Sequence, residues 1–262
     1  MLKKRLIGVV TVKNGWAVQS FGYDRYLPLG KPECLVENLD RWGADEILVQ
    51  VIDRSVLGVG PDFKLLEKLA QLGLGTPLIY GGGIRTVDEG IQVIQIGADR
   101  LTVDALLHDD LSVVSSLCDR LGAQALIASM PMTIGSQGPE LFNYISKATT
   151  ASTLKTLAKT IEQGVVSEVL LTDCQHEGKP YSFDNALVDL FPYKKVPLIA
   201  FGGISSTDQM QCLLARPNVA AVAVGNFLSY REHAIQQLKE GLASTALRPS
   251  IYATEYPLLA NV

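Results

Sequence analysis

Short apolar runs alternate with longer amphipathic stretches along this chain. Eight runs have the length of buried strands, and amphipathic segments with helical periodicity separate several of them. The runs lie at Arg5–Val12, Glu46–Val51, Leu78–Tyr80, Arg100–Val103, Ala125–Ser129, Glu168–Thr172, Leu198–Ala200 and Ala220–Val224. Such alternation is typical of a parallel sheet with helical crossovers. The pattern therefore predicts an α/β protein, a single (βα)8 TIM barrel.

Five amphipathic stretches are predicted to be helices that follow strands. They are Asp62–Leu72, Thr86–Ile96, Leu154–Gln163, Ser206–Leu214 and Ser229–Gly241. Thr86 and either Ser206 or Thr207 are suited to be N-caps, because a hydroxyl can accept a bond from a free backbone N–H.

Two connections are longer than a barrel requires, Asn14–Lys31 after the first strand and Pro131–Thr153 after the fifth. Both follow the carboxyl end of a strand, where barrels carry their chemistry, so we expect them to lie over the active face. The glycine, serine and threonine content of the second segment indicates a mobile loop, and an ordinary solvated loop fits it equally well.

The composition favours one domain covering residues 1–262. Of the 262 residues, 47% are hydrophobic and 19% charged, which is enough for one large core. The chain has no apolar stretch of membrane-spanning length and starts without a signal-peptide pattern, so we expect a cytoplasmic protein. A net charge of −4 without a basic stripe argues against nucleic acid or a membrane as partner and favours a small ligand.

The four cysteines, Cys34, Cys118, Cys174 and Cys212, are far apart and lack the spacing of a metal site. We therefore predict neither disulfides nor a metal, and we interpret three of them as small buried apolar residues. No pattern in the chain calls for a cofactor.

A repeated segment divides the chain. Pro77–Ile84 recurs as Pro197–Ile204 almost half the chain later, and in each copy an apolar run ends in glycines. This repeat indicates an internal half-barrel duplication with one anion-binding turn in each half. The predicted phosphate ligands are Gly82 and Gly83 in the first half and Gly202, Gly203, Gly225 and Asn226 in the second. Glycines that only form tight turns are the alternative. Asp104 opposes an anion in the first half, which predicts that one of the two phosphate sites is lost.

From Met1 to about Leu242 the chain resembles the HisF family, the cyclase subunits of imidazole glycerol phosphate synthase, and the sister isomerase HisA. The resemblance rests on seven motifs whose order and spacing are more specific than any one alone. They are Lys13-Asn-Gly15, Gly43-Ala-Asp-Glu46, Gly81-Gly-Gly-Ile84, Gly97-Ala-Asp99, Glu168-Val-Leu-Leu-Thr172, Gly202-Gly-Ile204 and Tyr230-Arg-Glu232. The resemblance implies a barrel that receives ammonia from a glutaminase subunit, passes it through its interior and uses two aspartates on a bisphosphorylated substrate. It also implies that Gly178 contacts phosphate.

Both aspartate positions of the family are substituted here. Thr11 stands at the first, and Pro131, or Met130 in a shifted alignment, stands at the second. None of these side chains can act as a general base near neutral pH. The family's mobile-loop lysine appears as Gln19, and its acidic residue on the second strand appears as Val51.

Three residues are candidates to replace the missing acids: Asp53, His176 and Glu177. His176 titrates near neutral pH and could serve as a general acid or base with Glu177 or Asp53 as its orienting partner; a solvated loop histidine is the alternative. Cys174 has no evident activating neighbour and makes a poor nucleophile candidate. His108 and His233 lie in charged helical contexts and are interpreted as surface residues.

At the opposite end of the barrel the resemblance implies an intact ammonia gate of Arg5, Glu46, Arg100 and Glu168. It further implies a glutaminase interface at Asp99 and Gln124. From the residues alone, the four gate positions predict two opposite-charge pairs, and a salt-bridge layer that closes the barrel is the alternative to a gate.

Three functions fit these observations. The first is a HisF-like subunit that takes ammonia from a HisH-type glutaminase for another reaction, amidination of a surface (lipopolysaccharide or O-antigen) sugar, with a sugar-amidating synthetase as further partner. The second is the imidazole glycerol phosphate synthase cyclase of histidine biosynthesis, using Asp53, Asp104 or Glu177. The third is a non-catalytic scaffold barrel.

Overall fold

The computed structural model of the protein describes residues 3–136, 138–150, 154, 156–157, 161–242, 247 and 249–250. Within these residues every helix is too short or too polar to cross a membrane.

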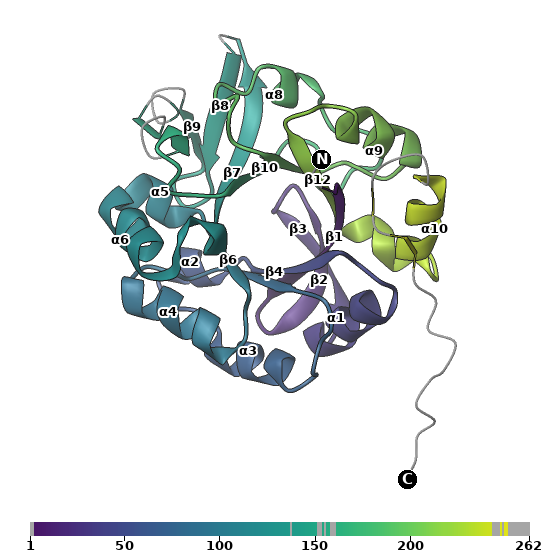
Figure 1. The fold of residues 1–262 in the computed structure, drawn as a ribbon, viewed down its shortest axis with the longest axis horizontal. Coiled ribbons are helices and arrows are strands. Elements are labelled where there is room, and N and C mark those ends of the chain that lie inside the picture. Colours follow the sequence, from purple (N-terminus) through teal and green to yellow (C-terminus); the bar gives the residue numbers. More distant parts are fainter. Residues whose placement is uncertain are drawn as a thin grey trace.

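Eight parallel strands form a closed barrel with helices around it (Figure 1). The barrel strands are β1 (Arg5–Lys13), β4 (Glu46–Val51), β5 (Leu78–Gly81), β6 (Arg100–Val103), β7 (Leu126–Gly135), β10 (Glu168–Asp173), β11 (Leu198–Phe201) and β12 (Val219–Val224). Each pairs with the next, and β12 pairs with β1, so the sheet has no open edge within the barrel. The predicted (βα)8 barrel is confirmed.

The helices begin and end at α1 (Pro32–Arg41), α2 (Arg54–Leu57), α3 (Phe63–Ala70), α4 (Val87–Ile96), α5 (Ala105–Asp109), α6 (Leu111–Leu121), α8 (Ala186–Asp189), α9 (Thr207–Leu214) and α10 (Ala234–Gly241), with 3-10 turns η1 (Ala123–Ala125) and η2 (Asn226–Tyr230). Thr86 caps α4 in a capping box with Glu89, and Ser206 caps α9, as predicted. Four residues of the predicted helix Leu154–Gln163, 155 and 158–160, lie outside the described residues; of the others, 154, 156, 157, 161 and 162 are helical.

The predicted helix Ser229–Gly241 is wrong over its first turns. The segment divides into η2 and α10, because His233 adopts a left-handed conformation with φ of 54° that interrupts helical bonding.

The two long connections are β-structure rather than loops, which corrects the second prediction for its described part. After β1 the chain forms the hairpin β2 (Trp16–Phe21) and β3 (Arg25–Gly30). The fifth barrel strand runs well past the predicted end and pairs with β8 (Gly138–Asn143), which pairs with β9 (Ala148–Thr150). Antiparallel pairing satisfies backbone groups that a loop would leave to water.

The core has two parts that together position the site. One lies between the barrel and its helices, and the other fills the barrel interior. The interior cluster consists of Ile7, Val9, Leu48, Ile79, Ile127, Leu170, Ile199, Phe201, Ala221 and Ala223. Alternate residues of a strand face the same side, so the inward positions before and after this cluster are polar or charged on three strands. They are Arg5 and Thr11 on β1, Glu46 and Gln50 on β4, and Glu168 and Thr172 on β10.

A buried ion pair attaches the last helix to the barrel. Lys239 Nζ lies 2.7 Å from Asp45 Oδ1 and donates to the Gly43 carbonyl, while Asp45 also accepts from the Leu6 N–H. The two side chains are 2% and 1% exposed, so α10 is held through a pair that water cannot replace.

The interpretation of three cysteines as buried is wrong. Cys34 and Cys212 are exposed and Cys118 and Cys174 are partly buried. Cys34 on α1 and Cys212 on α9 lie on helix faces turned away from the barrel, which the spacing of apolar residues alone did not reveal.

Candidate functional site

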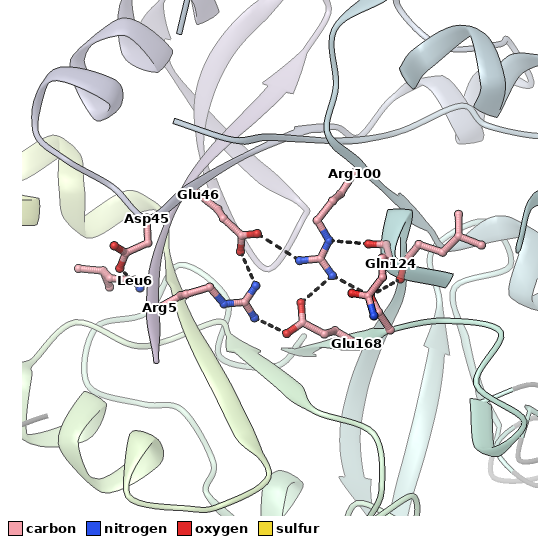
Figure 2. A network of polar contacts seen from close by, with 9 residues as sticks. Arg5, Leu6, Asp45, Glu46, Arg100, Gln124 and Glu168 are labelled. Carbon is pink, nitrogen blue, oxygen red and sulfur yellow. Dashed lines mark hydrogen bonds and ion pairs between the residues drawn. The ribbon is translucent and has the colours of Figure 1, made fainter. Parts of the chain in front are cut away.

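Four charged side chains close the amino-terminal end of the barrel in a ring (Figure 2). Arg5 Nη1 lies 2.9 Å from Glu46 Oε2, and the other guanidinium nitrogen of Arg5 contacts Glu168. Arg100 Nη1 lies 3.2 Å from Glu46 Oε1, and its Nη2 lies 2.6 Å from Glu168 Oε2. The prediction of two separate pairs is corrected, because each carboxylate bridges both arginines.

The ring is nearly closed to solvent. The side chains of Glu46 and Glu168 are 8% and 9% exposed. Burial lowers the pKa of Arg5, but Glu168 and Glu46 outweigh it, and the net effect raises that pKa. Arg100 is fixed further by bonds from Nε to the Gln124 carbonyl, 3.1 Å, and from Nη2 to the Ser167 hydroxyl, 2.8 Å. Each of the two guanidinium groups contacts both carboxylates through two different nitrogens, and this cross-linking makes the ring rigid.

Asp99 and Gln124, expected at a glutaminase interface, are both exposed beside this ring. Asp99 precedes β6 and accepts a bond from the Leu78 N–H at 2.8 Å, and Gln124 lies in η1. Asp99 precedes Arg100 in the chain and the Gln124 carbonyl accepts a bond from Arg100, so both residues lie at the ring end of the barrel.

At the opposite end, Thr11 and Pro131 are buried on β1 and β7. Thr11 lies two residues beyond Val9 of the interior cluster, and Pro131 lies four beyond Ile127, so both face the barrel interior. Pro131 is in register with Thr172 of β10. The positions that hold acids in the resembled family therefore carry no titratable group at this mouth.

Glu177 holds the β2–β3 hairpin rather than facing open space. Its carboxylate accepts bonds from the Ser20 hydroxyl, 3.1 Å, and the Tyr23 N–H, 3.2 Å, and its carbonyl accepts from Gly22. Burial raises the pKa of Glu177, although these bonds oppose the effect. Its contacts make it a positioning residue for the hairpin.

His176 is oriented by Asp173, not by Glu177 or Asp53 as expected. The imidazole Nδ1 lies 2.7 Å from Asp173 Oδ2, and the same carboxylate accepts from the Asp184 N–H at 2.8 Å. Asp173 is buried and three residues earlier in the same turn, a spacing that could have identified it. Burial and Asp173 raise the pKa of Cys174 to about 11, so it is a thiol near neutral pH.

The second glycine turn is covered by protein. The Gly203 carbonyl accepts bonds from the Ser182 and Phe183 N–H groups, and a methyl group on Gly202 would lie 2.6 Å from the Asp173 carbonyl oxygen. Both glycines have positive φ, so the backbone itself requires glycine here.

The other predicted ligands of this half make protein contacts as well. Asn226 exchanges two bonds with the backbone of Ser20, and a methyl group on Gly178 would lie 2.2 Å from the Ser20 carbonyl oxygen. Gly225 borders a separate cavity of about 420 Å³ near α1.

The first glycine turn borders a cavity of about 580 Å³ at the barrel mouth. Gly82 and Gly83 line it together with polar residues of β4, β6 and β7 and with the tips of the two hairpins. The Tyr23 and Tyr144 rings meet at 4.7 Å and join the hairpins over the cavity. His108 lines this cavity, which corrects its interpretation as a surface residue: α5 turns it toward the mouth. His233 is exposed as expected.

Asp104 gives this mouth its electrostatic character. It follows β6 and faces the cavity, and burial, with a smaller contribution from Asp109, raises the pKa of its carboxyl to about 7. Burial also lowers the pKa of His108, against an opposing effect of Asp109, so its imidazole is neutral at pH 7. A carboxyl that titrates near neutral pH can either donate or accept a proton here.

Replacing Asp104 with asparagine is expected to raise the melting temperature at pH 8 by about 2–8 °C. The folded chain keeps a proton on Asp104 up to about pH 7, whereas an unfolded chain loses it near pH 4. The folded state thus binds more protons between these values, so wild-type stability falls as pH rises through this window. Calorimetry at pH 5 and pH 8 should show a smaller pH dependence for Asp104→Asn; an unchanged dependence would contradict the assignment.

This chain is similar to known proteins over almost its whole length. A family model described as "Histidine biosynthesis protein" matches residues 5–234. The "Imidazole glycerol phosphate synthase subunit HisF" of Natranaerobius thermophilus is 26% identical over 244 residues, 93% of this chain and 97% of that protein. The "Putative imidazole glycerol phosphate synthase subunit hisF2" of Campylobacter jejuni is 29% identical over 246 residues, 93% of this chain and 96% of that protein. A protein of the same description from Pseudomonas aeruginosa is 26% identical over 236 residues, 89% and 94% of the two chains.

Proposed function

Because this chain belongs to the histidine biosynthesis protein family and is a divergent HisF-type member of it, we propose that it is the HisF-like subunit of a glutamine-dependent amidotransferase complex. In this proposal a HisH-type glutaminase subunit docks at the ring end and releases ammonia into the barrel. The ammonia leaves at the mouth for an acceptor reaction, the amidination of a surface sugar, with a sugar-amidating synthetase as further partner.

One observation carries the proposal: the two ends of the barrel differ in what they retain. Arg5, Glu46, Arg100 and Glu168 form a complete ring, whereas Thr11 and Pro131 leave the mouth without the acids of a HisF cyclase. A barrel that receives ammonia but does not use it in ring closure needs the charged ring but does not need the acids at the mouth.

The interior supports passage of a neutral molecule. Between ring and mouth the barrel is filled with aliphatic side chains, one phenylalanine and the small residues Ala221 and Ala223. Such a lining disfavours ammonium and other ions but not ammonia, because desolvating a charge is far more costly than desolvating a neutral amine. Entry requires one guanidinium of the ring to swing aside, and Arg5 has fewer additional bonds than Arg100.

Two alternatives differ in what the mouth does. The cyclase of imidazole glycerol phosphate synthase would require Asp53 or Asp104 to act in place of the missing acids, and both line the mouth cavity. A scaffold barrel would need only the docking end.

Mixing the purified chain with the HisH-type glutaminase from the same genome is expected to give a one-to-one complex that hydrolyses glutamine faster than the glutaminase alone. Replacing Asp99 with arginine should raise the dissociation constant of the complex by at least about tenfold, because it puts a positive charge where the glutaminase subunit is proposed to meet a negative one. Asp88→Arg is a matched control, since Asp88 is an exposed aspartate in the first turn of α4, whereas Asp99 follows the carboxyl end of that helix. Size-exclusion chromatography and glutamate release measure the two effects. Absence of a complex, or equal binding by the Asp99 and Asp88 variants, would reject the proposed docking end.

A further inference from the structure

The mouth cavity contains polar atoms that have no partner among the described residues. Asp53 Oδ1 and His108 Nε2 are both buried and unpaired, while the other oxygen of Asp53 accepts from the Asn14 N–H at 2.8 Å. Asp104 makes no side-chain bond as the N-cap of α5. A buried carboxylate oxygen without a donor is costly, so these groups are arranged for hydrogen-bond donors that come from a ligand.

Aromatic rings form another part of the cavity wall. Phe142 and Tyr144 meet edge to face at 5.1 Å, and Tyr144 in turn contacts Tyr23. Tyr26 also lines the cavity, with Lys13 Nζ 3.6 Å above its ring. Aromatic faces carry negative charge density and attract the C–H groups of a saturated ring.

Phosphate does not fit this wall, although the glycine turn suggested it. The Gly83 N–H already donates to the Ser55 hydroxyl at 3.2 Å. The buried, unpaired Oδ1 of Asp53 would repel a phosphate dianion, and so would Asp104 once it is ionised. Two lysines also line the cavity, but Lys13 lies over the Tyr26 ring and Lys147 is exposed to solvent, so neither faces these carboxyls from a buried position. A ligand with several hydroxyl groups and no charge satisfies the same acceptors without repulsion.

The cavity and the charged ring are connected through the barrel interior. Along β6, Arg100, Thr102 and Asp104 are alternate residues and so face the barrel interior. Along β4, Glu46 and Gln50 are related in the same way. Thr102, Asp104 and Gln50 line the cavity, so ring and cavity are the two ends of one interior face.

We propose that this cavity binds the uncharged, hydroxyl-bearing ring of a sugar, with Asp53 and Asp104 accepting bonds from its hydroxyls and the Tyr144 side of the wall packing on its C–H face. The cavity volume lies within the range of sites for small molecules. The inference rests on the proposed function, since it places the acceptor of the ammonia on this chain; its test, however, involves neither ammonia nor glutaminase.

The test is saturation-transfer NMR on the purified full-length chain with four free sugars, glucose, mannose, galactose and N-acetylglucosamine, and ³¹P line widths with inorganic phosphate. At least one sugar should bind saturably and phosphate should not. At pH 8, above the pKa of Asp104, Asp53→Ala and Asp104→Ala should each weaken sugar binding by about tenfold or more, the loss expected for a bond to a charged group. Asp208→Ala, on the exposed face of α9, should leave it unchanged.

Failure of all four sugars to bind would overturn the inference, and so would binding that is insensitive to both cavity variants. Saturable phosphate binding to the wild-type chain would overturn it as well. A chain that forms the glutaminase complex but binds no sugar rejects this inference alone, whereas one that binds sugar without forming the complex rejects the docking end alone.

Discussion

Replacing Arg5 with alanine is expected to lower the free energy of unfolding by about 3–5 kcal/mol, the cost of removing one partner from a buried ion pair. Arg5 joins Glu46 and Glu168, whose side chains are almost fully buried, and its loss leaves both carboxylates sharing Arg100 alone. Urea denaturation of wild type and variant measures the difference.

The control is an exposed pair in the same chain. Arg216 contacts Asp189, whose side chain is 58% exposed, and Arg216→Ala should cost no more than about 1 kcal/mol because water replaces the contact. Adding Glu168→Gln to Arg5→Ala should recover part of the loss, since it removes one of the two like charges. A cost for Arg5→Ala as small as that for Arg216→Ala would mean that water enters the ring, which would then be an open gate rather than a closed one.

The barrel could be predicted from the sequence because its signal is local. Buried parallel strands are continuous apolar runs, and the eight runs from Arg5 to Val224 coincide with the eight strands to within a few residues at most ends. β7 is the exception. Its extension to Gly135 depends on pairing with β8, a contact between segments that periodicity within either one does not reveal.

The site could be predicted only in part, because local sequence signals do not reveal contacts between segments that are apart in the chain. The ring residues were found through the family resemblance, because they stand at the starts of four predicted strands, which the structure shows as β1, β4, β6 and β10. The partner of His176 and the coverage of Gly203 depend on how the turn after β10 folds back on itself. The two glycine turns, at Gly82–Gly83 and Gly202–Gly203, have the same positive φ angles but different surroundings. The first borders a cavity, and residues 182–183 cover the second.

The wild-type chain is expected to convert the bisphosphorylated substrate of HisF cyclases at least about 10⁴-fold more slowly than such a cyclase, with ammonia in excess. A general acid or base contributes about 10²–10⁴-fold, and here two are absent at once. Thr11 and Pro131 offer no proton-transfer group at the mouth. The assay follows product formation with a genuine HisF cyclase as positive control.

The double variant Thr11→Asp, Pro131→Asp tests whether the missing acids alone, or also changes in the phosphate sites, prevent turnover. We expect it to stay inactive, because a substrate with two phosphates would meet Asp104 in the first half and the Ser182–Phe183 turn over Gly203 in the second. Recovery of activity would instead show that both phosphates still bind. Turnover by the wild-type chain would favour the cyclase alternative, with Asp53 or Asp104 as the acting acid, since these are carboxylates that line the cavity. We therefore expect three changes together to prevent cyclase chemistry: the absent acids, the residues that cover the second glycine turn, and Asp104 beside the first.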